Sequence, residues 1–313
     1  MTPVPVFTGA AVEAAVSPQR AVEAVRDAFV AHARREWSMP PKVYVTNYPA
    51  GDFRAMPALG GGYALLKWIT SFPGNPARGL PTVTGVVLVS DAKTGELRAV
   101  LDAASVTALR TGAAAVLAAE TLGRTGASTA AVIGAGVNGR AAARTFLARG
   151  QPVALWDVAA ERAAVVADEL GASVASARED ALAADLVVTV TPGHAVLLPE
   201  GTLRAGQHVS LMGADGPGKA EAASGELVRA RLFCDDWEQA SHGGELAHAV
   251  EDGSISHEDV TALGDVLAGD AQGRTNDDEI TMFDSTGLAI QDLAIALAAL
   301  EQADELDLPT LPL

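Results

Sequence analysis

Three glycines near the middle of the chain have the spacing of a dinucleotide-binding turn. They form the pattern Gly134-x-Gly136-x-x-Gly139, which follows the apolar run 130–133 and precedes a helix-favouring stretch. The first glycine of such a turn allows a tight bend, the second lets the backbone approach a pyrophosphate, and the third lets the helix pack on the strand. Free N–H groups at the start of the helix then face the anion. The alternative is a glycine-rich turn of another α/β protein, but the order of strand, glycines and helix favours a dinucleotide.

An acidic residue after the next apolar run indicates which dinucleotide is bound. Residues 153–157 have the composition of a second strand, and Asp157 ends it. In this kind of unit an acid about 20 residues beyond the glycines accepts the hydrogen bonds of the adenosine ribose diol, and its charge repels a 2′-phosphate. The sequence therefore predicts NAD rather than NADP.

Two basic residues occur where a charge is unusual. Lys67 lies in a strongly apolar strand-like run, 63–69, where burial is costly unless an anion meets the ammonium group. It can equally be an outward-facing lysine of a half-exposed strand. Arg110 lies in an alanine-rich helical stretch, and its guanidinium can hold a carboxylate or phosphate with two parallel hydrogen bonds. The alternative for Arg110 is a solvated position on the helix surface.

A third candidate, Asp215, follows the strand-like run 208–212. Ligands of doubly wound sheets bind beyond the carboxyl ends of the strands, so an acid in this loop can hold a substrate ammonium or act as a general base. The alternative is a turn residue in a glycine- and proline-rich loop. Thr191 ends another apolar run and is expected where the cofactor passes.

Composition excludes several classes of protein. The 313 residues carry a net charge of −17, which argues against binding nucleic acid or an anionic membrane. The single cysteine, Cys234, rules out an intrachain disulfide and fits a reducing cytoplasm. The 6 histidines show no metal-ligand spacing, so no metal site is expected. We find no signal peptide and no apolar run long enough to span a bilayer, which predicts a soluble cytoplasmic protein.

The order of the predicted elements indicates an α/β protein with two domains. A helix that begins at Ser17-Pro18 precedes a region of strands and turns, which predicts a mostly antiparallel sheet. Beyond a long helix at 103–122, strands and helices alternate as in a parallel, doubly wound Rossmann sheet, and a last helix is expected over 286–306. The predicted domains are 1–118 with 288–313, an α+β unit, and 119–287, the Rossmann unit.

Together these residues resemble the ornithine cyclodeaminase/mu-crystallin family over most of the chain. The motifs that carry the resemblance are Met56-Pro57-Ala58, Lys67, residues 108–113, the glycine turn, Met212-Gly213-Ala214-Asp215, Pro217-Gly218-Lys219 and residues 283–287. The resemblance implies that the α+β unit binds the substrate and forms a homodimer through its sheet. It also implies a small L-amino acid or cyclic imine as the substrate.

The resemblance assigns roles to individual residues. Lys67 and Arg110 would hold the carboxylate of the amino acid, Arg110 also lying near the cofactor phosphates. Asp215 would be the catalytic acid/base at the amine, and Thr286 would border the substrate. The NAD site would further be lined by Thr82, Val137, Asn138, Asp157, Thr191, Met212 and Lys219.

Two positions depart from the family pattern. Lys42 stands where the family usually has a carboxylate-binding arginine, so the charge is kept and the planar fork is lost. Arg54 stands where cyclodeaminases tend to carry a glutamate, and an arginine there disfavours a long cationic side chain such as that of ornithine.

The resemblance leaves three activities open. The first choice is a cyclodeaminase, in which α-hydride transfer to NAD⁺ gives an imine, cyclisation releases ammonia and the hydride returns, as in conversion of L-ornithine to L-proline. Residues 215–219 match that branch most closely. The alternatives are an alanine dehydrogenase or ketimine reductase with net NADH turnover, and a crystallin-like protein that binds the dinucleotide without catalysis. Asp215 favours a catalyst over a binding protein.

Overall fold

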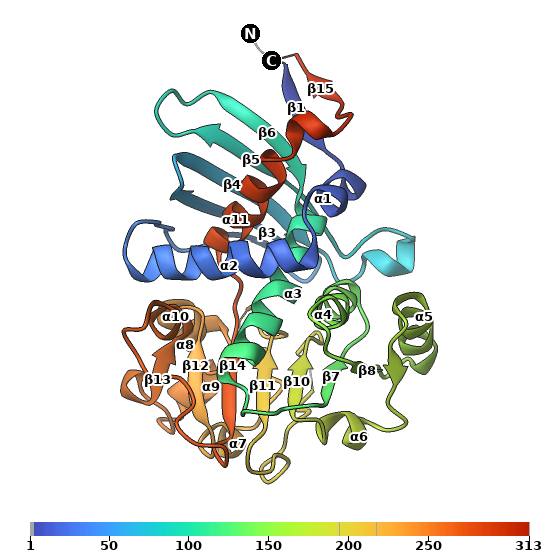
Figure 1. Cartoon of the computed structure of the whole chain (residues 1–313), viewed down its shortest axis with the longest axis vertical. Coiled ribbons are helices and arrows are strands. Elements are labelled where there is room, and N and C mark those ends of the chain that lie inside the picture. Colours follow the sequence, from blue (N-terminus) through green and yellow to red (C-terminus); the bar gives the residue numbers. More distant parts are fainter. Residues whose placement is uncertain (1–2, 194, 217, 313) are drawn as a thin grey trace. The chain divides into compact units, whose positions relative to one another are not determined.

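The computed structural model describes residues 3–193, 195–216 and 218–312, which form two compact units (Figure 1). The first comprises Met1–Arg110 with Leu288–Leu313, and the second comprises Thr111–Gly287. The division falls after Arg110 rather than after residue 118. Both positions lie within one uninterrupted helix, α3 (Ala103–Leu122), so nothing in the local sequence marks the change of unit.

The first unit is built on a seven-stranded sheet in the order β15-β1-β6-β5-β4-β3-β2. Pairing is antiparallel from β2 to β6, while β1 runs parallel to β6, so the sheet is mostly antiparallel as predicted. Its strands are β1 (Val4–Phe7), β2 (Val43–Asn47), β3 (Gly51–Gly60), β4 (Tyr63–Ser71), β5 (Val83–Asp91), β6 (Leu97–Asp102) and β15 (Thr310–Leu311). Its helices besides α3 are α1 (Gly9–Ala15), α2 (Pro18–Ala33) and α11 (Ala289–Leu300), with short 3-10 turns η1 (Asn75–Arg78) and η3 (Ala303–Glu305).

The two faces of this sheet differ in burial. Alternate residues of a strand point to opposite faces, and one set, including Met56, Leu65 and Val87, is buried on the side where α11 packs on β3, β4 and β5. Figure 1 shows α11 crossing these strands. The opposite face exposes large apolar side chains in neighbouring strands: Val43, Val45, Leu59, Leu66, Trp68 and Val86. We call these six residues the apolar sheet face.

The helix start predicted at Ser17 is confirmed. The Ser17 hydroxyl accepts a hydrogen bond from the Arg20 N–H, and Pro18 occupies the first turn, where its missing N–H is not needed. The helix ends at Ala33. Arg35, with φ 59°, has left the helical region of backbone space.

The second unit is a parallel eight-stranded sheet in the order β13-β12-β14-β11-β10-β7-β8-β9, so the predicted doubly wound Rossmann fold is confirmed. Its strands are β7 (Ala130–Ile133), β8 (Val153–Trp156), β9 (Ser173–Val174), β10 (Leu186–Thr189), β11 (His208–Leu211), β12 (Arg231–Cys234), β13 (Val260–Ala262) and β14 (Thr281–Asp284). Its helices are α4 (Val137–Ala148), α5 (Ala160–Leu170), α6 (Arg178–Leu182), α7 (Ser224–Leu227), α8 (Trp237–Gly243), α9 (Ala247–Glu251) and α10 (Leu263–Ala268), with the 3-10 turn η2 (His257–Asp259).

The central strands β7, β10, β11 and β14 are buried along their whole length, as expected for a parallel sheet covered on both faces. Several polar side chains among them are paired with one another. The ring nitrogens of His208 lie 3.0 Å from the hydroxyls of Thr281 and Ser210, and burial lowers the pKa of this histidine to about 3. His208 is therefore a neutral core residue.

Within the described residues, no helix is long and apolar enough to cross a membrane.

Candidate functional site

The glycine turn has the geometry that a pyrophosphate needs. Gly134 has φ +107°, and a Cβ there would lie 2.8 Å from the carbonyl oxygen of Val190. A Cβ at Gly139 would collide with the carbonyl oxygen of Gly134, so helix α4 and strand β7 can pack this closely only with glycine at both positions. A Cβ at Gly136 would meet no atom within 4 Å. The backbone therefore borders open space at the one glycine that should approach the ligand.

Helix α4 begins directly at this open space. Gly136 is its N-cap and has no side chain to accept a hydrogen bond from the first turn. The first N–H groups of a helix, here including those of Val137 and Asn138, have no acceptor within the helix and attract an anion. The side chain of Val137 is 70% exposed, which leaves the approach to this turn open.

Asp157 lies at the end of β8 and is nearly buried. Its Oδ2 accepts a hydrogen bond from the N–H of Ala135 at 2.7 Å, and its Oδ1 accepts one from the N–H of Ala159 at 2.8 Å. Arg162 Nη1 lies 3.4 Å from the carboxylate. Asp157 thus holds the glycine turn in place, and the longest of its contacts, from Arg162 Nη1 to both oxygens, is the one that a ribose diol would replace. This arrangement fits the predicted cofactor, NAD.

Two further candidates meet in the loop after β11. Lys219 Nζ lies 2.5 Å from Asp215 Oδ1, and both side chains are partly exposed. Asp215 is thus a carboxylate that solvent or a small molecule can reach, with a cation beside it. Met212, which precedes this loop, is buried, and its N–H donates to the carbonyl oxygen of Thr189. Pro217 of the same motif lies outside the described residues.

In the first unit, Lys67 of β4 points into the buried side of the sheet, so the alternative of an outward-facing lysine is wrong. Its side chain is 1% exposed and its Nζ lies 2.6 Å from Asp292 Oδ2 on α11. It also donates to the hydroxyl of Thr107 at 3.3 Å. A buried ammonium is stable only with such partners, because transfer of an unpaired charge from water is costly.

Arg110 lies beside the same carboxylate. Its Nε is 3.6 Å from Asp292 Oδ1, and its Nη1 donates to Gln291 Oε1 at 3.5 Å. Its side chain is only 12% exposed, so a solvated position on the helix surface is also wrong. Two cations therefore flank one buried carboxylate, and Asp292 is a site residue that the sequence reasoning missed. A carboxylate among the apolar residues of the last helix is the same kind of signal that singled out Lys67.

Burial lowers the pKa of Lys67 to about 8, from an ordinary value of 10.5. The charge of Asp292 raises this pKa, while the charges of Arg110 and Lys42 lower it. The half-buried Lys42, just before β2, thus adds a third positive charge to the surroundings of Lys67.

Arg54 is held by its own strand and by the neighbouring one. Its Nε donates to Asp52 Oδ1 at 2.6 Å, and its guanidinium lies 5.3 Å from the ring centre of Tyr44 on β2. Both groups hold the cation in place by charge and by its attraction to the ring face. The carboxylate of Asp52 therefore already has a cationic partner, Arg54.

Two more candidates, Thr82 and Thr286, lie in different units. Thr82 is half-buried just before β5 in the first unit, and its carbonyl oxygen accepts from the Phe72 N–H. Thr286 is buried in the second unit, where its hydroxyl donates to Asp235 Oδ1 at 3.1 Å. The last helix, predicted over 286–306, does not include Thr286. The N–H groups of Ser285 and Gly287 donate to Leu211 and Asp235, and α11 begins at Ala289.

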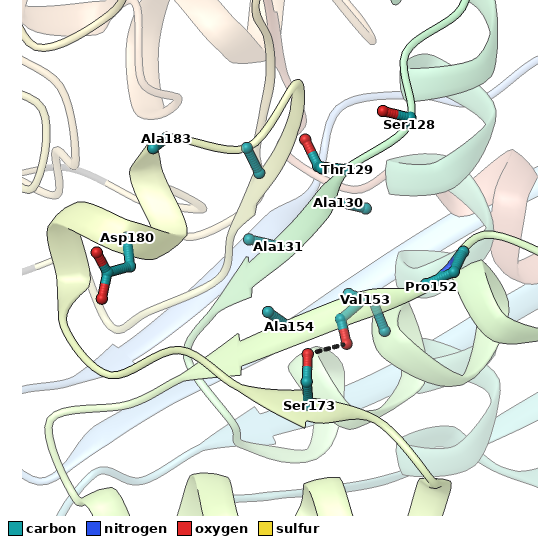
Figure 2. A pocket seen from close by; sticks show the side chains of 11 residues that line it. Ser128, Thr129, Ala130, Ala131, Pro152, Val153, Ala154, Ser173, Asp180 and Ala183 are labelled. Carbon is teal, nitrogen blue, oxygen red and sulfur yellow. Dashed lines mark hydrogen bonds between the residues drawn. The ribbon is translucent and has the colours of Figure 1, made fainter.

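A cavity of about 320 Å³ lies in the second unit, at the ends of β7 and β8 where these strands begin (Figure 2). Residues at the starts of β7 and β8, such as Ala130 and Val153, line it together with Ser173 and Asp180. The glycine turn follows the opposite, carboxyl end of β7. Among the described residues, no three histidine, cysteine or acidic side chains are placed to hold a metal ion.

Comparison with known proteins decides the family. The model of the ornithine cyclodeaminase/mu-crystallin family matches residues 5–306. The chain belongs to this family. The chain is 42% identical to the alanine dehydrogenase of Archaeoglobus fulgidus over 306 residues, which covers 95% of this chain and 94% of that protein.

Solved structures of the family extend this comparison. An archaeal alanine dehydrogenase dimer with bound NAD has a TM-score of 0.93 and 40% identity and covers 99% of both chains. A lysine cyclodeaminase has a TM-score of 0.87 and 30% identity, covering 100% of this chain and 96% of that one. The predicted NAD cofactor agrees with the bound NAD of the first neighbour.

Proposed function

We propose that the protein is an NAD-dependent dehydrogenase of a small L-α-amino acid, of the alanine dehydrogenase type. The nearly full-length similarity to an alanine dehydrogenase supports this, and so do the side chains of the first unit. The cyclodeaminase reaction, our first choice from the sequence, becomes the second candidate. Its support is the similarity to the lysine cyclodeaminase.

The observation that carries the proposal is the pair of cations around Asp292. Lys67 and Arg110 supply two positive charges, and Asp292 neutralises one of them. The group is left with a net positive charge, increased by Lys42. Because an isolated buried charge is unfavourable, such a group favours a ligand with one carboxylate, and the arginine fork suits that ligand's geometry.

The proposal gives each residue a step in the reaction. Lys67 and Arg110 bind and orient the carboxylate of the amino acid. Asp215 takes a proton from the ammonium group, so that the nitrogen lone pair can assist loss of the α-hydrogen. Lys219 balances the charge of Asp215 until the proton arrives. NAD⁺, when bound, supplies the hydride acceptor, and the glycine turn with Asp157 holds its adenosine and phosphates.

Arg54 supports a small apolar side chain over a diamine. A substrate with a terminal ammonium needs an acidic partner, and the carboxylate of Asp52 already pairs with Arg54 at 2.6 Å. A second cation at this point would add repulsion. Alanine-like substrates make no such demand.

A panel of L-amino acids that includes alanine, ornithine and lysine tests the proposal. Reduced nicotinamide absorbance and ammonia release are followed together for each substrate. With a small amino acid, a dehydrogenase transfers the α-hydride to NAD⁺, and water then hydrolyses the resulting imine to a keto acid and ammonia. NADH and ammonia therefore form in equal amounts. Ammonia without net NADH from a diamine would show the cyclodeaminase instead. Binding of NAD⁺ with neither product across the panel would favour the crystallin-like alternative.

We further propose that the protein forms a homodimer through the apolar sheet face. These side chains are 39% to 57% exposed, and such a contiguous apolar surface favours association with a second protein surface. The archaeal alanine dehydrogenase neighbour is a dimer.

A further inference from the structure

Glu221 is a glutamate of the second unit that is completely buried yet lies at the carboxyl ends of two strands. The loop that carries Asp215 and Lys219 leads back to it. Its carboxylate accepts four hydrogen bonds: Oε2 accepts from the Thr189 hydroxyl at 2.7 Å and the Gly213 N–H at 3.1 Å, and Oε1 accepts from the Thr191 N–H at 2.9 Å and the Thr191 hydroxyl at 2.6 Å. Glu221 therefore joins the segment after β10 to the segment after β11.

Gly213 shows how closely this carboxylate is fitted. A Cβ at Gly213 would lie 2.5 Å from Glu221 Cδ and 2.6 Å from the carbonyl oxygen of Thr191. Side-chain carbons do not approach other atoms this closely, so the carboxylate occupies the space that a side chain at position 213 would need. The two loop segments and Glu221 form one packed group.

A second buried acid holds Glu221 in turn. Glu245 accepts from the Glu221 N–H at 2.7 Å and from the Ala222 N–H at 2.6 Å, and it is also fully buried. Burial raises the pKa of Glu245 to about 8, and the charge of Glu221 contributes to this rise. Among the described residues no cation pairs with Glu221, so hydrogen bonds alone compensate its burial. A buried carboxylate without a cation is costly to keep, which suggests that its position serves a purpose.

We propose that Glu221 is a positioning residue for the nicotinamide half of NAD, which it serves by fixing Thr191 and Gly213, and that Glu245 in turn fixes Glu221. A doubly wound sheet binds a dinucleotide as two halves on either side of the point where strand order reverses. The glycine turn and Asp157 follow β7 and β8 and suit the adenosine half. Thr191 and Gly213 follow β10 and β11, on the other side, where the nicotinamide half belongs. This inference rests on the proposed use of NAD.

The variant Glu221→Gln replaces the carboxylate by an amide of nearly the same shape, and so tests the hydrogen bonds that the carboxylate accepts. In either orientation of the amide, the NH₂ group faces the N–H of Thr191 or that of Gly213, and neither can accept a hydrogen bond. We expect NAD⁺ affinity, measured by titration, to fall about tenfold or more. Affinity for ADP, which carries adenosine and both phosphates but no nicotinamide, is expected to stay within about twofold, because the glycine turn and Asp157 are untouched.

Glu226→Gln is the control for loss of a buried carboxylate elsewhere in the unit. Glu226 is also buried and accepts two backbone N–H groups, those of Gly201 and Leu203, and unlike Glu221 it also pairs with a cation, Arg229, at 2.6 Å. These N–H groups precede β11 and so lie at the amino end of the strands. We expect this variant to lose stability in thermal unfolding while keeping its affinity for NAD⁺. In a Thr191→Val background, Glu221→Gln should weaken NAD⁺ binding less than it does alone, because both changes break the same contact.

If Glu221→Gln does not fold, Glu245→Gln decides the question, since the Glu245 carboxylate reaches Glu221 through the backbone N–H groups of residues 221 and 222. A folded Glu221 or Glu245 variant that binds NAD⁺ as the wild type does, or that loses ADP and NAD⁺ affinity equally, would overturn the inference. Wild-type protein that binds no NAD⁺ would contradict the proposed function itself. Wild-type protein that binds NAD⁺ without oxidising any amino acid would contradict only the proposed reaction.

Discussion

Lys67 Nζ lies 2.6 Å from Oδ2 of Asp292, and neither side chain is more than 1% exposed. This ion pair joins strand β4 to helix α11, two elements that lie near opposite ends of the sequence. Breaking a buried pair by removing one partner costs about 3–5 kcal/mol, because the other charge is left buried without compensation. The pair therefore contributes to the fold of the first unit as well as to its proposed chemistry.

Carboxylate binding should weaken as the pH rises through about 8. The pKa of Lys67 is lowered to about 8, so the ammonium is charged below this pH and neutral above it. Only the charged form attracts a carboxylate. Propionate, which has a carboxylate and no amine, isolates this effect as a competitive inhibitor. Its inhibition constant should rise up to about tenfold per pH unit above pH 8.

Lys67→Arg is the control for this pH dependence. The guanidinium stays protonated over the whole range, so inhibition by propionate should become nearly independent of pH. A wild-type inhibition constant that is flat between pH 7 and about 9.5 would contradict a carboxylate-binding role for Lys67.

Asp215→Asn should remove turnover and leave cofactor binding almost unchanged. The amide cannot take the proton of the substrate ammonium, and general acid–base groups contribute about 10²–10⁴-fold to rates. We expect kcat to fall by at least about 10²-fold, with NAD⁺ affinity within about twofold of wild type. Turnover that survives the substitution would show that another group is the base.

Asp157→Ser should change the choice of cofactor. Removing the carboxylate lifts the repulsion of a 2′-phosphate, and Arg162, now 3.4 Å from Asp157, would then be able to meet that phosphate. We expect the ratio of kcat/KM for NADP⁺ to that for NAD⁺ to rise about tenfold or more. As a control, Glu161→Gln removes one negative charge from the first turn of α5, the helix that carries Arg162. This variant should leave the ratio unchanged. An unchanged ratio in Asp157→Ser would count against its contact with the ribose.

Charges placed on the apolar sheet face should separate the proposed dimer. Leu66→Glu and Trp68→Glu together put two carboxylates on a surface that dimerisation would bury. Light scattering of the wild type should give the mass of a dimer, and the double variant should give that of a monomer. Val165→Glu introduces a charge at a 62% exposed position of the second unit and should not alter the mass. A dimer that persists in the double variant would place the interface elsewhere.

The sequence predicted elements whose signals are local. The glycine turn, the parallel strands around it and the helix start at Ser17 each depend on neighbouring residues, and the structure has all of them. Strand β3 (Gly51–Gly60) went unpredicted because Pro57 and the terminal glycines are typical of turns. Its inward-facing polar residues, Asp52 and Arg54, also hide the alternation that marks a strand.

Buried acids were the main omission among candidate site residues. Asp292 and Glu221 look like ordinary polar residues in the sequence. Their roles can be recognised only from the side chains that folding places beside them, Lys67 and Thr189. Lys67 stands out in the sequence because it interrupts an apolar strand. Glu221 does not stand out, because it follows a loop rich in glycine and charged residues. Such residues can be found only once the strand order is known.

The contact between Gly213 and Glu221 makes two positions of the chain dependent on each other. Because the carboxyl group lies where a methyl group at 213 would be, a relative is expected to keep both residues or to replace both. A related sequence with alanine at position 213 and a shorter residue at position 221 would lack the contact through which Glu221 joins the two loop segments. That combination can be recognised without a structure, and it would separate family members that hold the cofactor loops in this way from those that do not.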